Sequence, residues 1–152
     1  MSTNACPLCA LKPEQLLWSG AGIQVLAVTD SPFPGYTRII WHDHVAEMTD
    51  LPEEQRQHIM AAVYVVEQTQ REQLGTTKIN LAQFGNQVPH LHWHIIPRWK
   101  EDPFFPDSAW SPAPERTAEQ KQRWASHEER LLEQLGEYQQ ALRTALQARF
   151  SH

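Results

Sequence analysis

Short apolar stretches bounded by turn residues occupy most of the first hundred positions, and each has the composition of a β-strand. Residues 16–30 contain two such stretches around Ser19-Gly20-Ala21-Gly22, which is typical of a hairpin. Residues 36–42, 77–84 and 91–98 are also strand-like, because they are enriched in β-branched and aromatic side chains. The pattern therefore predicts five strands.

A helical period follows the third of these strands. Asp50 has the position of an N-cap and Glu53 lies three residues later, which is the spacing of a capping box. Leu74-Gly75 supplies a C-terminal stop. Three apolar residues recur at helical spacing between these ends and mark the face that we expect to be buried: Ile59, Val63 and Val66.

A longer helix is predicted to begin near the C-terminal end of the sequence, where Thr117 and Gln120 form a second capping box. Most of its residues are polar, so its apolar stripe is narrow. We expect that stripe to pack on the same domain or on a partner subunit. The stripe consists of Trp124, Leu131, Leu135, Tyr138, Leu142 and Leu146.

The segment 99–115 separates the last strand from this helix and is rich in proline, which excludes regular structure over most of it. It also carries Phe104, Phe105 and Trp110, three large aromatic residues that favour burial. We therefore predict an ordered strap over the domain.

The length of 152 residues suits one domain with its own core. The formal net charge is −5, from 18 acidic and 13 basic residues, which argues against non-specific binding to nucleic acid. The first residues lack the basic and apolar regions of a signal peptide, and no window approaches the roughly 18 consecutive apolar residues of a membrane span. We expect a cytoplasmic protein that binds neither nucleic acid nor membrane.

The segment "HLHWHIIPR" places His90, His92 and His94 at alternate positions in an apolar run. On a strand the three imidazoles share one face, while Leu91 and Ile95 face the other; a helix would spread the rings over about 200°. Each buried neutral imidazole needs a hydrogen-bond partner, so a purely structural role is costly. Two functional alternatives remain at this point: a metal site and a nucleophilic site.

The wider segments around the row are similar to those of the histidine triad (HIT) superfamily of nucleotide hydrolases and transferases. "PGYTRIIWHDHV" resembles the family element P-G-H-x-L-V-I-P-x-x-H-V, which places His44 at its upstream histidine. "INLAQFGNQVPHLHWHIIPR" resembles the segment that leads into the triad, and with "DSAW" it is similar to a bacterial branch related to diadenosine polyphosphate hydrolases. The resemblance implies the α+β class, with a HIT-like sheet of about five antiparallel strands and one main helix, here joined by a long C-terminal helix.

The resemblance also implies roles for individual residues. His92 is the expected nucleophile, which attacks an α-phosphorus and forms a nucleotidyl-histidine without a catalytic metal. His94 is expected to bind a phosphate oxygen or to protonate the leaving group. Asn80 and Gln87 are expected to donate hydrogen bonds to phosphate oxygens, and Asp30 is expected to bind the ribose or, equally, to cap its own turn.

A second candidate site begins with "CPLC". A thioredoxin-type redox pair needs a preceding strand, and only five residues precede Cys6, so half of a tetrahedral zinc site fits better. By resemblance to zinc-bearing HIT-like proteins, the ligands of a structural zinc are Cys6, Cys9, His44 and His90. His42 is an alternative to His44, and two reduced cysteines without metal are the simpler interpretation. In the bacterial branch, Gln often replaces the histidine at position 90.

These observations define one functional hypothesis with two rivals. Residues 1–113 form a HIT-like catalytic domain for an AMP-type phosphoanhydride or phosphoramidate, such as a diadenosine polyphosphate or a nucleoside phosphoramidate, and residues 114–152 form a helical extension. As in most of the family, a homodimer is expected. One rival is a metalloenzyme that uses all three triad histidines as ligands. The other is a nucleotide-binding or sensing module without turnover.

Overall fold

Five antiparallel strands form a single sheet in the order β1-β2-β3-β5-β4. The computed structural model describes residues 6–150, and the strands are β1 (Leu16–Gly20), β2 (Ile23–Ala27), β3 (Thr37–Trp41), β4 (Lys78–Ala82) and β5 (His92–Arg98). The helices are α1 (Glu53–Leu74) and α2 (Ala118–Phe150), with short 3-10 turns at Pro13–Gln15 and Met48–Asp50. The α+β class and the five predicted strands are confirmed.

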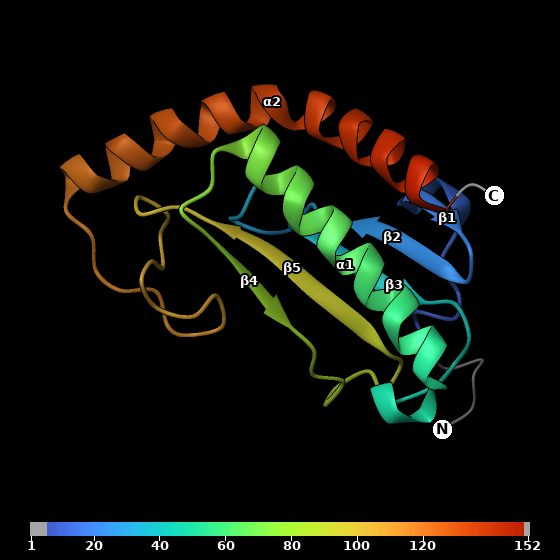
Figure 1. The fold of residues 1–152 in the computed structure, drawn as a ribbon. Coiled ribbons are helices and arrows are strands. Elements are labelled where there is room, and N and C mark those ends of the chain that lie inside the picture. Colours follow the sequence, from blue (N-terminus) through green and yellow to red (C-terminus); the bar gives the residue numbers. More distant parts are fainter. Residues whose placement is uncertain (1–5, 151–152) are drawn as a thin grey trace.

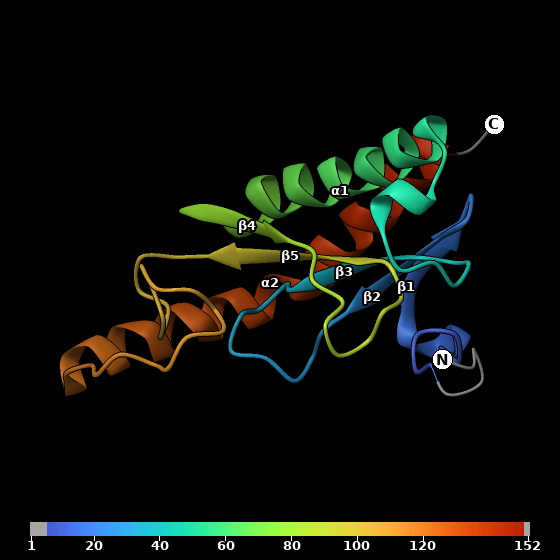
Figure 2. The same cartoon turned by 90° about the horizontal axis from the view of Figure 1, so that it is seen from below.

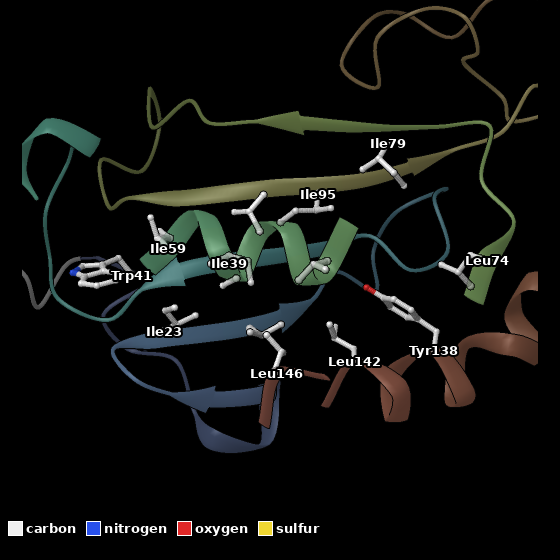
Figure 3. Close-up of a cluster of buried hydrophobic side chains, with 14 of the residues drawn as sticks. Ile23, Ile39, Trp41, Ile59, Leu74, Ile79, Ile95, Tyr138, Leu142 and Leu146 are labelled. Atoms are coloured by element: carbon white, nitrogen blue, oxygen red, sulfur yellow. The ribbon is translucent and has the colours of Figure 1, made fainter. Parts of the chain in front are cut away.

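Both helices lie on one face of the sheet, and the long α2 runs beside α1 (Figures 1 and 2). The strand register turns one set of side chains toward them, because Val25 pairs with Ile39 and Thr37 pairs with Ile95. The core fills the space between sheet and helices, as Figure 3 shows. Side chains at the intervening positions, including those of His92 and His94, face the other side of the sheet.

The predicted apolar faces of both helices are confirmed. All three predicted positions of α1 are fully buried, and the α2 stripe is buried except at Leu135, which is partly buried against the core. The α2 stripe reaches the sheet directly, since the hydroxyl of Tyr138 lies 2.8 Å from Thr37 Oγ1 on β3. Neither helix combines the length and the apolar character that a membrane crossing requires over the described residues.

The two predicted caps had different outcomes. The amide of Gln120 donates to Thr117 Oγ1 and the amide of Thr117 donates to Gln120 Oε1, so the capping box at the start of α2 is confirmed. The capping box at Asp50 is wrong. Asp50 ends a 3-10 turn, where its carboxylate accepts the amide of Glu47, and Pro52 occupies the N-cap of α1.

The strap between β5 and α2 is anchored by a buried ion pair. Arg98 Nε donates to Asp102 Oδ2 at 2.8 Å, and the two side chains are 3% and 0% exposed. Asp102 also accepts backbone amides of the strap, and the Arg98 guanidinium donates to the carbonyl of Asp107. The amides that bind Asp102 belong to Trp99, Phe104 and Phe105. This network explains how a proline-rich segment without regular structure keeps one shape.

Candidate active site and metal cluster

The face of the sheet without helices carries a cavity of about 450 Å³ at the strands β3 and β5. His92 and His94 point to this face from β5, and Arg38 lies beside His94 on β3 in the paired register. The loop between β4 and β5 and the strap complete the wall. The lining residues are Arg38, Phe84, Gly85, Asn86, Gln87, Val88, His92, His94 and Trp110.

The sequence predicts that the three histidines share one strand face, but β5 begins only at His92. His90 lies in the preceding bend, where the chain turns to bring the Leu91 amide to the carbonyl of Val45. Its imidazole lies on the same face of the sheet but contacts the two cysteines and does not line the cavity. The cavity contains two of the three imidazoles, and the third belongs to a different cluster.

His92 is held in one tautomer by the main chain. Its Nδ1 lies 2.6 Å from the carbonyl oxygen of His90, and a carbonyl can only accept, so Nδ1 carries the proton. The Nε2 atom is then left with a free lone pair. Burial lowers the pKa of His92, and the charges of Arg38 and His90 lower it further, although the His90 carbonyl opposes them. His92 is therefore a neutral imidazole with an available nitrogen.

His94 is held by a phenol instead. The Tyr36 hydroxyl lies 2.6 Å from His94 Nδ1, and burial raises the pKa of Tyr36, so this phenol keeps its proton and can donate it to Nδ1. In that arrangement Nε2 of His94 carries a hydrogen. Burial, with smaller contributions from the charges of Arg38 and His92, lowers the pKa of His94 to about 4. The neutral ring is then a hydrogen-bond donor at Nε2.

Two exposed aromatic residues form the rim of the cavity. Phe84 and Trp110 meet edge to face with ring centroids 4.9 Å apart, and the Trp110 ring lies 5.3 Å from that of His94. Trp110 is 52% exposed, so the expectation that it is buried is wrong. Its partners are the rim and His94 rather than the core, which leaves apolar ring surface available to a flat ligand.

The predicted binding residues do not all reach the cavity. Gln87 lines it from the loop before β5, whereas Asp30 lies in an exposed bend outside the lining residues. Asn80 lies on β4, where its Oδ1 accepts a hydrogen bond of 2.8 Å from Arg98. Arg38 lines the cavity and was not predicted from the sequence, although a charged residue within an apolar strand is the signal that could have revealed it.

The four predicted metal ligands lie close together on the same face of the sheet, next to the start of β5. One ligand atom from each of Cys6, Cys9, His44 and His90 lies within 4.8 Å of the others, so the group could hold a metal ion. Cys9 Sγ lies 3.3 Å from His44 Nδ1 and 3.4 Å from His90 Nδ1. His42 is outside the group; its imidazole is exposed and lies 3.3 Å from the carboxylate of Asp43.

His90 connects the cluster to the cavity. Its Nε2 lies 2.6 Å from the carbonyl of Trp41, so Nε2 carries the proton. Nδ1 therefore has a free lone pair, which faces both cysteines. A metal-binding histidine usually donates its second N–H in this way. The backbone carbonyl of His90 meanwhile accepts the proton of His92 Nδ1. One residue thus serves both sites through different atoms.

A sheet covered by two helices on one face, with an imidazole pair in a cavity on the other, defines an α+β protein of the histidine triad type. The chain belongs to the HIT domain family, which matches residues 13–101. Members of this family are generally nucleotide hydrolases or transferases. No curated protein matches the chain in sequence.

Solved structures of the same fold agree with this assignment. A histidine triad protein from Marinobacter aquaeolei VT8 is 31% identical, with a TM-score of 0.59 over 79% of this chain and 89% of the other. One from Bradyrhizobium japonicum is 26% identical, with a TM-score of 0.61 over 85% and 99%. A Zn-bound histidine triad family protein from Mycobacterium smegmatis is 20% identical, with a TM-score of 0.61 over 95% of each chain.

Proposed function

We propose that this protein attacks the α-phosphate of an AMP-type phosphoanhydride or phosphoramidate through a nucleotidyl-histidine intermediate, as in the branch related to diadenosine polyphosphate hydrolases. The observation that carries the proposal is the hydrogen bond from His92 Nδ1 to the carbonyl of His90. It leaves the Nε2 lone pair of a neutral imidazole in a cavity large enough for a phosphate and its substituents.

The proposed reaction has two displacements. In the first, His92 Nε2 forms a bond to the α-phosphorus, and the bond from phosphorus to the leaving group breaks with its electron pair on the leaving atom. In the second, water attacks the phosphorus, the P–N bond breaks, its electrons return to Nε2, and a proton is released with the nucleotide. The carbonyl of His90 stabilises the positive imidazole ring between the two steps.

Hydrogen-bond donors of neutral residues are proposed to hold the phosphate. His94 Nε2–H can donate to a phosphate oxygen or to the leaving group, and Gln87 can donate from the loop. The amide nitrogen of Asn80 is not used in its bond to Arg98 and can also donate. Asp30 is proposed as the ribose contact, because its exposed carboxylate can accept a hydrogen bond from a hydroxyl, although it lies outside the residues that line the cavity. The rim of Phe84 and Trp110 offers a surface for a nucleobase.

A structural zinc is proposed at the cysteine–histidine cluster. In a tetrahedral site with Zn–S of about 2.3 Å and Zn–N of about 2.0 Å, neighbouring ligand atoms are separated by about 3.3–3.8 Å. The separations of 3.3 and 3.4 Å between Cys Sγ and His Nδ1 fit this geometry. The zinc would supply cross-linking of the N-terminal segment to the sheet and no chemistry. A Zn-bound protein of the same fold supports the proposal.

The arrangement of the imidazoles favours direct attack over the metalloenzyme alternative. His90 turns its ring toward the cysteines, and the proton on His92 Nδ1 is committed to a carbonyl, so the three rings do not converge on one point. A binding module without turnover would not need the Nε2 lone pair of His92 to be kept free. We further infer a homodimer in the cytoplasm, with residues 1–113 as the catalytic domain and 114–152 as an extension.

The decisive experiment traps the intermediate. The full-length protein, treated with a chelator of free divalent ions, is mixed with diadenosine tetraphosphate or adenosine phosphoramidate labelled at the α-phosphate and quenched rapidly. We expect label on the protein that is stable in base and labile in acid, as a phosphoramidate is. His92→Asn should retain no label while its nucleotide affinity changes less than about tenfold.

The matched control for this experiment is His127→Asn, since His127 is partly exposed on α2 and is not among the residues that line the cavity. It should label like the wild type. Turnover of both substrates with no label on the protein, or near-normal turnover by His92→Asn, would refute the nucleotidyl-histidine. Turnover that requires added metal and disappears equally with each triad histidine would support the metalloenzyme instead.

A further inference from the structure

Arg38 is a cation in the cavity wall without a matching anion. Its Nε is buried and has no hydrogen-bond partner, and its side chain takes part in no ion pair within residues 6–150. Among the described residues, none that lines the cavity is acidic. A buried guanidinium nitrogen without a partner is costly, so this arrangement indicates that an anionic ligand completes the site.

The position of Arg38 along β3 distinguishes two sides of the cavity. In the register of β3 and β5, Arg38 pairs with His94, and Ile40 pairs with His92. Directly paired residues have Cβ atoms about 5 Å apart on one face of the sheet. The proposed nucleophile therefore has an apolar neighbour across the strands, and the guanidinium lies beside the imidazole expected at the leaving group.

Neighbouring groups fix the position of the Arg38 guanidinium. Its central carbon lies 5.5 Å from the centroid of the Tyr36 ring, within the range of a cation–π contact, and the hydroxyl of the same tyrosine holds His94. Arg38 and His94 are thus fixed relative to one another by one aromatic side chain. A planar fork of donors held in this way matches two oxygens of a phosphate.

We infer that Arg38 binds the phosphate of the leaving group and makes this protein selective for phosphoanhydrides over phosphoramidates. The inference rests on the proposed function, because it assigns a leaving group to the same reaction. It concerns the group beyond the α-phosphorus, whereas the attack by His92 is common to both classes of substrate.

The two leaving groups differ in charge. When an anhydride reacts, the bond between the α-phosphorus and the bridging oxygen breaks, and the departing phosphate gains one negative charge, which the guanidinium stabilises. When a phosphoramidate reacts, the P–N bond breaks and the nitrogen must take up a proton to leave as ammonia or an amine. A fixed positive charge gives that nitrogen no stabilisation. Arg38 therefore lowers the barrier for one class and not for the other.

The test compares kcat/KM for diadenosine tetraphosphate and adenosine phosphoramidate in wild type, Arg38→Met and Arg38→Lys. Methionine keeps much of the length and removes the charge. We expect Arg38→Met to lose about 100-fold on the anhydride, and at least about 30-fold more there than on the phosphoramidate. Arg38→Lys, which keeps the charge without the fork, should lie between these values. Arg123→Met on the exposed face of α2 is the matched control and should resemble wild type.

Calorimetric titration with inorganic pyrophosphate separates this inference from the proposed function. If wild type turns over neither substrate, the proposed function fails and the titration alone decides on Arg38. Pyrophosphate binding at least about tenfold weaker in Arg38→Met supports an anion site at Arg38, and equal binding overturns it. Equal losses on both substrates in the folded variant also overturn the selectivity. If Arg38→Met does not fold, Arg38→Lys decides by the same two measurements.

Discussion

Replacing Asp102 by alanine tests the ion pair that anchors the strap. The change removes both carboxylate contacts to Arg98, at 2.8 and 3.1 Å, together with the hydrogen bonds from three strap amides, and leaves a guanidinium whose side chain is 3% exposed. Removal of one partner from a buried ion pair costs about 3–5 kcal/mol, because the remaining charge stays out of water. Asn80 and the Asp107 carbonyl still bind the guanidinium, so we expect a loss of about 3 kcal/mol, at the low end.

The assay is urea unfolding of the full-length chain, followed by tryptophan fluorescence at constant pH. The matched control is Glu119→Ala, which breaks an ion pair with the same i, i+4 spacing on an exposed part of α2. Exposed pairs contribute less than about 1 kcal/mol, so the control should change the free energy of unfolding by about 0.5 kcal/mol or less. A loss below about 1 kcal/mol for Asp102→Ala would refute the reasoning, since the buried pair would then behave like an exposed one.

A second expectation concerns pH. His94 has a pKa of about 4 in the folded chain against 6.5 for an exposed imidazole, so the unfolded chain takes up the proton first as the pH falls. The stability that the neutral His94 ring contributes is therefore complete above about pH 6.5 and declines as the pH falls toward 4. Between about pH 7 and pH 5, wild type should lose about 2 kcal/mol more unfolding free energy than His94→Gln, and equal losses contradict the buried neutral ring. A third concerns metal: the purified chain should hold about one zinc, and chelation should lower Tm more than the initial rate. Elemental analysis without zinc in wild type, or zinc content unchanged in Cys9→Ser, would contradict the cluster.

Periodicity in the sequence predicted the strands, the helices and their buried faces, because a side chain's face follows from its position in a strand or helix; the antiparallel sheet was implied by the family resemblance. Ile59 in α1 and Leu142 in α2 each belong to a series of apolar residues at helical spacing, and both are completely buried in the core. The end of a strand depends on distant hydrogen bonds instead. His90 fits the alternation of β5, yet the bond from the Leu91 amide to Val45 turns the chain there, and nothing in the local pattern indicates this bond.

The candidate site was predictable only in part, because some of its features are visible in the sequence and others exist only in the folded chain. The Cys6–Cys9 spacing and the family resemblance identified a cluster whose members do meet, although they come from three separate segments. Arg38 was missed because a single charged residue in a strand also fits an exposed face. Trp110 was misjudged because size favours burial in general, while its actual exposure depends on the cavity rim that only the folded chain creates.

His90 contributes its side chain to the cysteine–histidine cluster and its backbone carbonyl to the cavity, which has a consequence for how proteins of this family diverge. Its side chain faces the cysteines, but the atom that orients His92 is its backbone carbonyl, which every amino acid possesses. A lineage could therefore exchange this histidine for glutamine, lose both cysteines and still keep the orientation of His92, the proposed nucleophile. Under the proposed function, the zinc could be lost or regained at this position without loss of the orientation of His92, provided that other contacts hold the bend before β5.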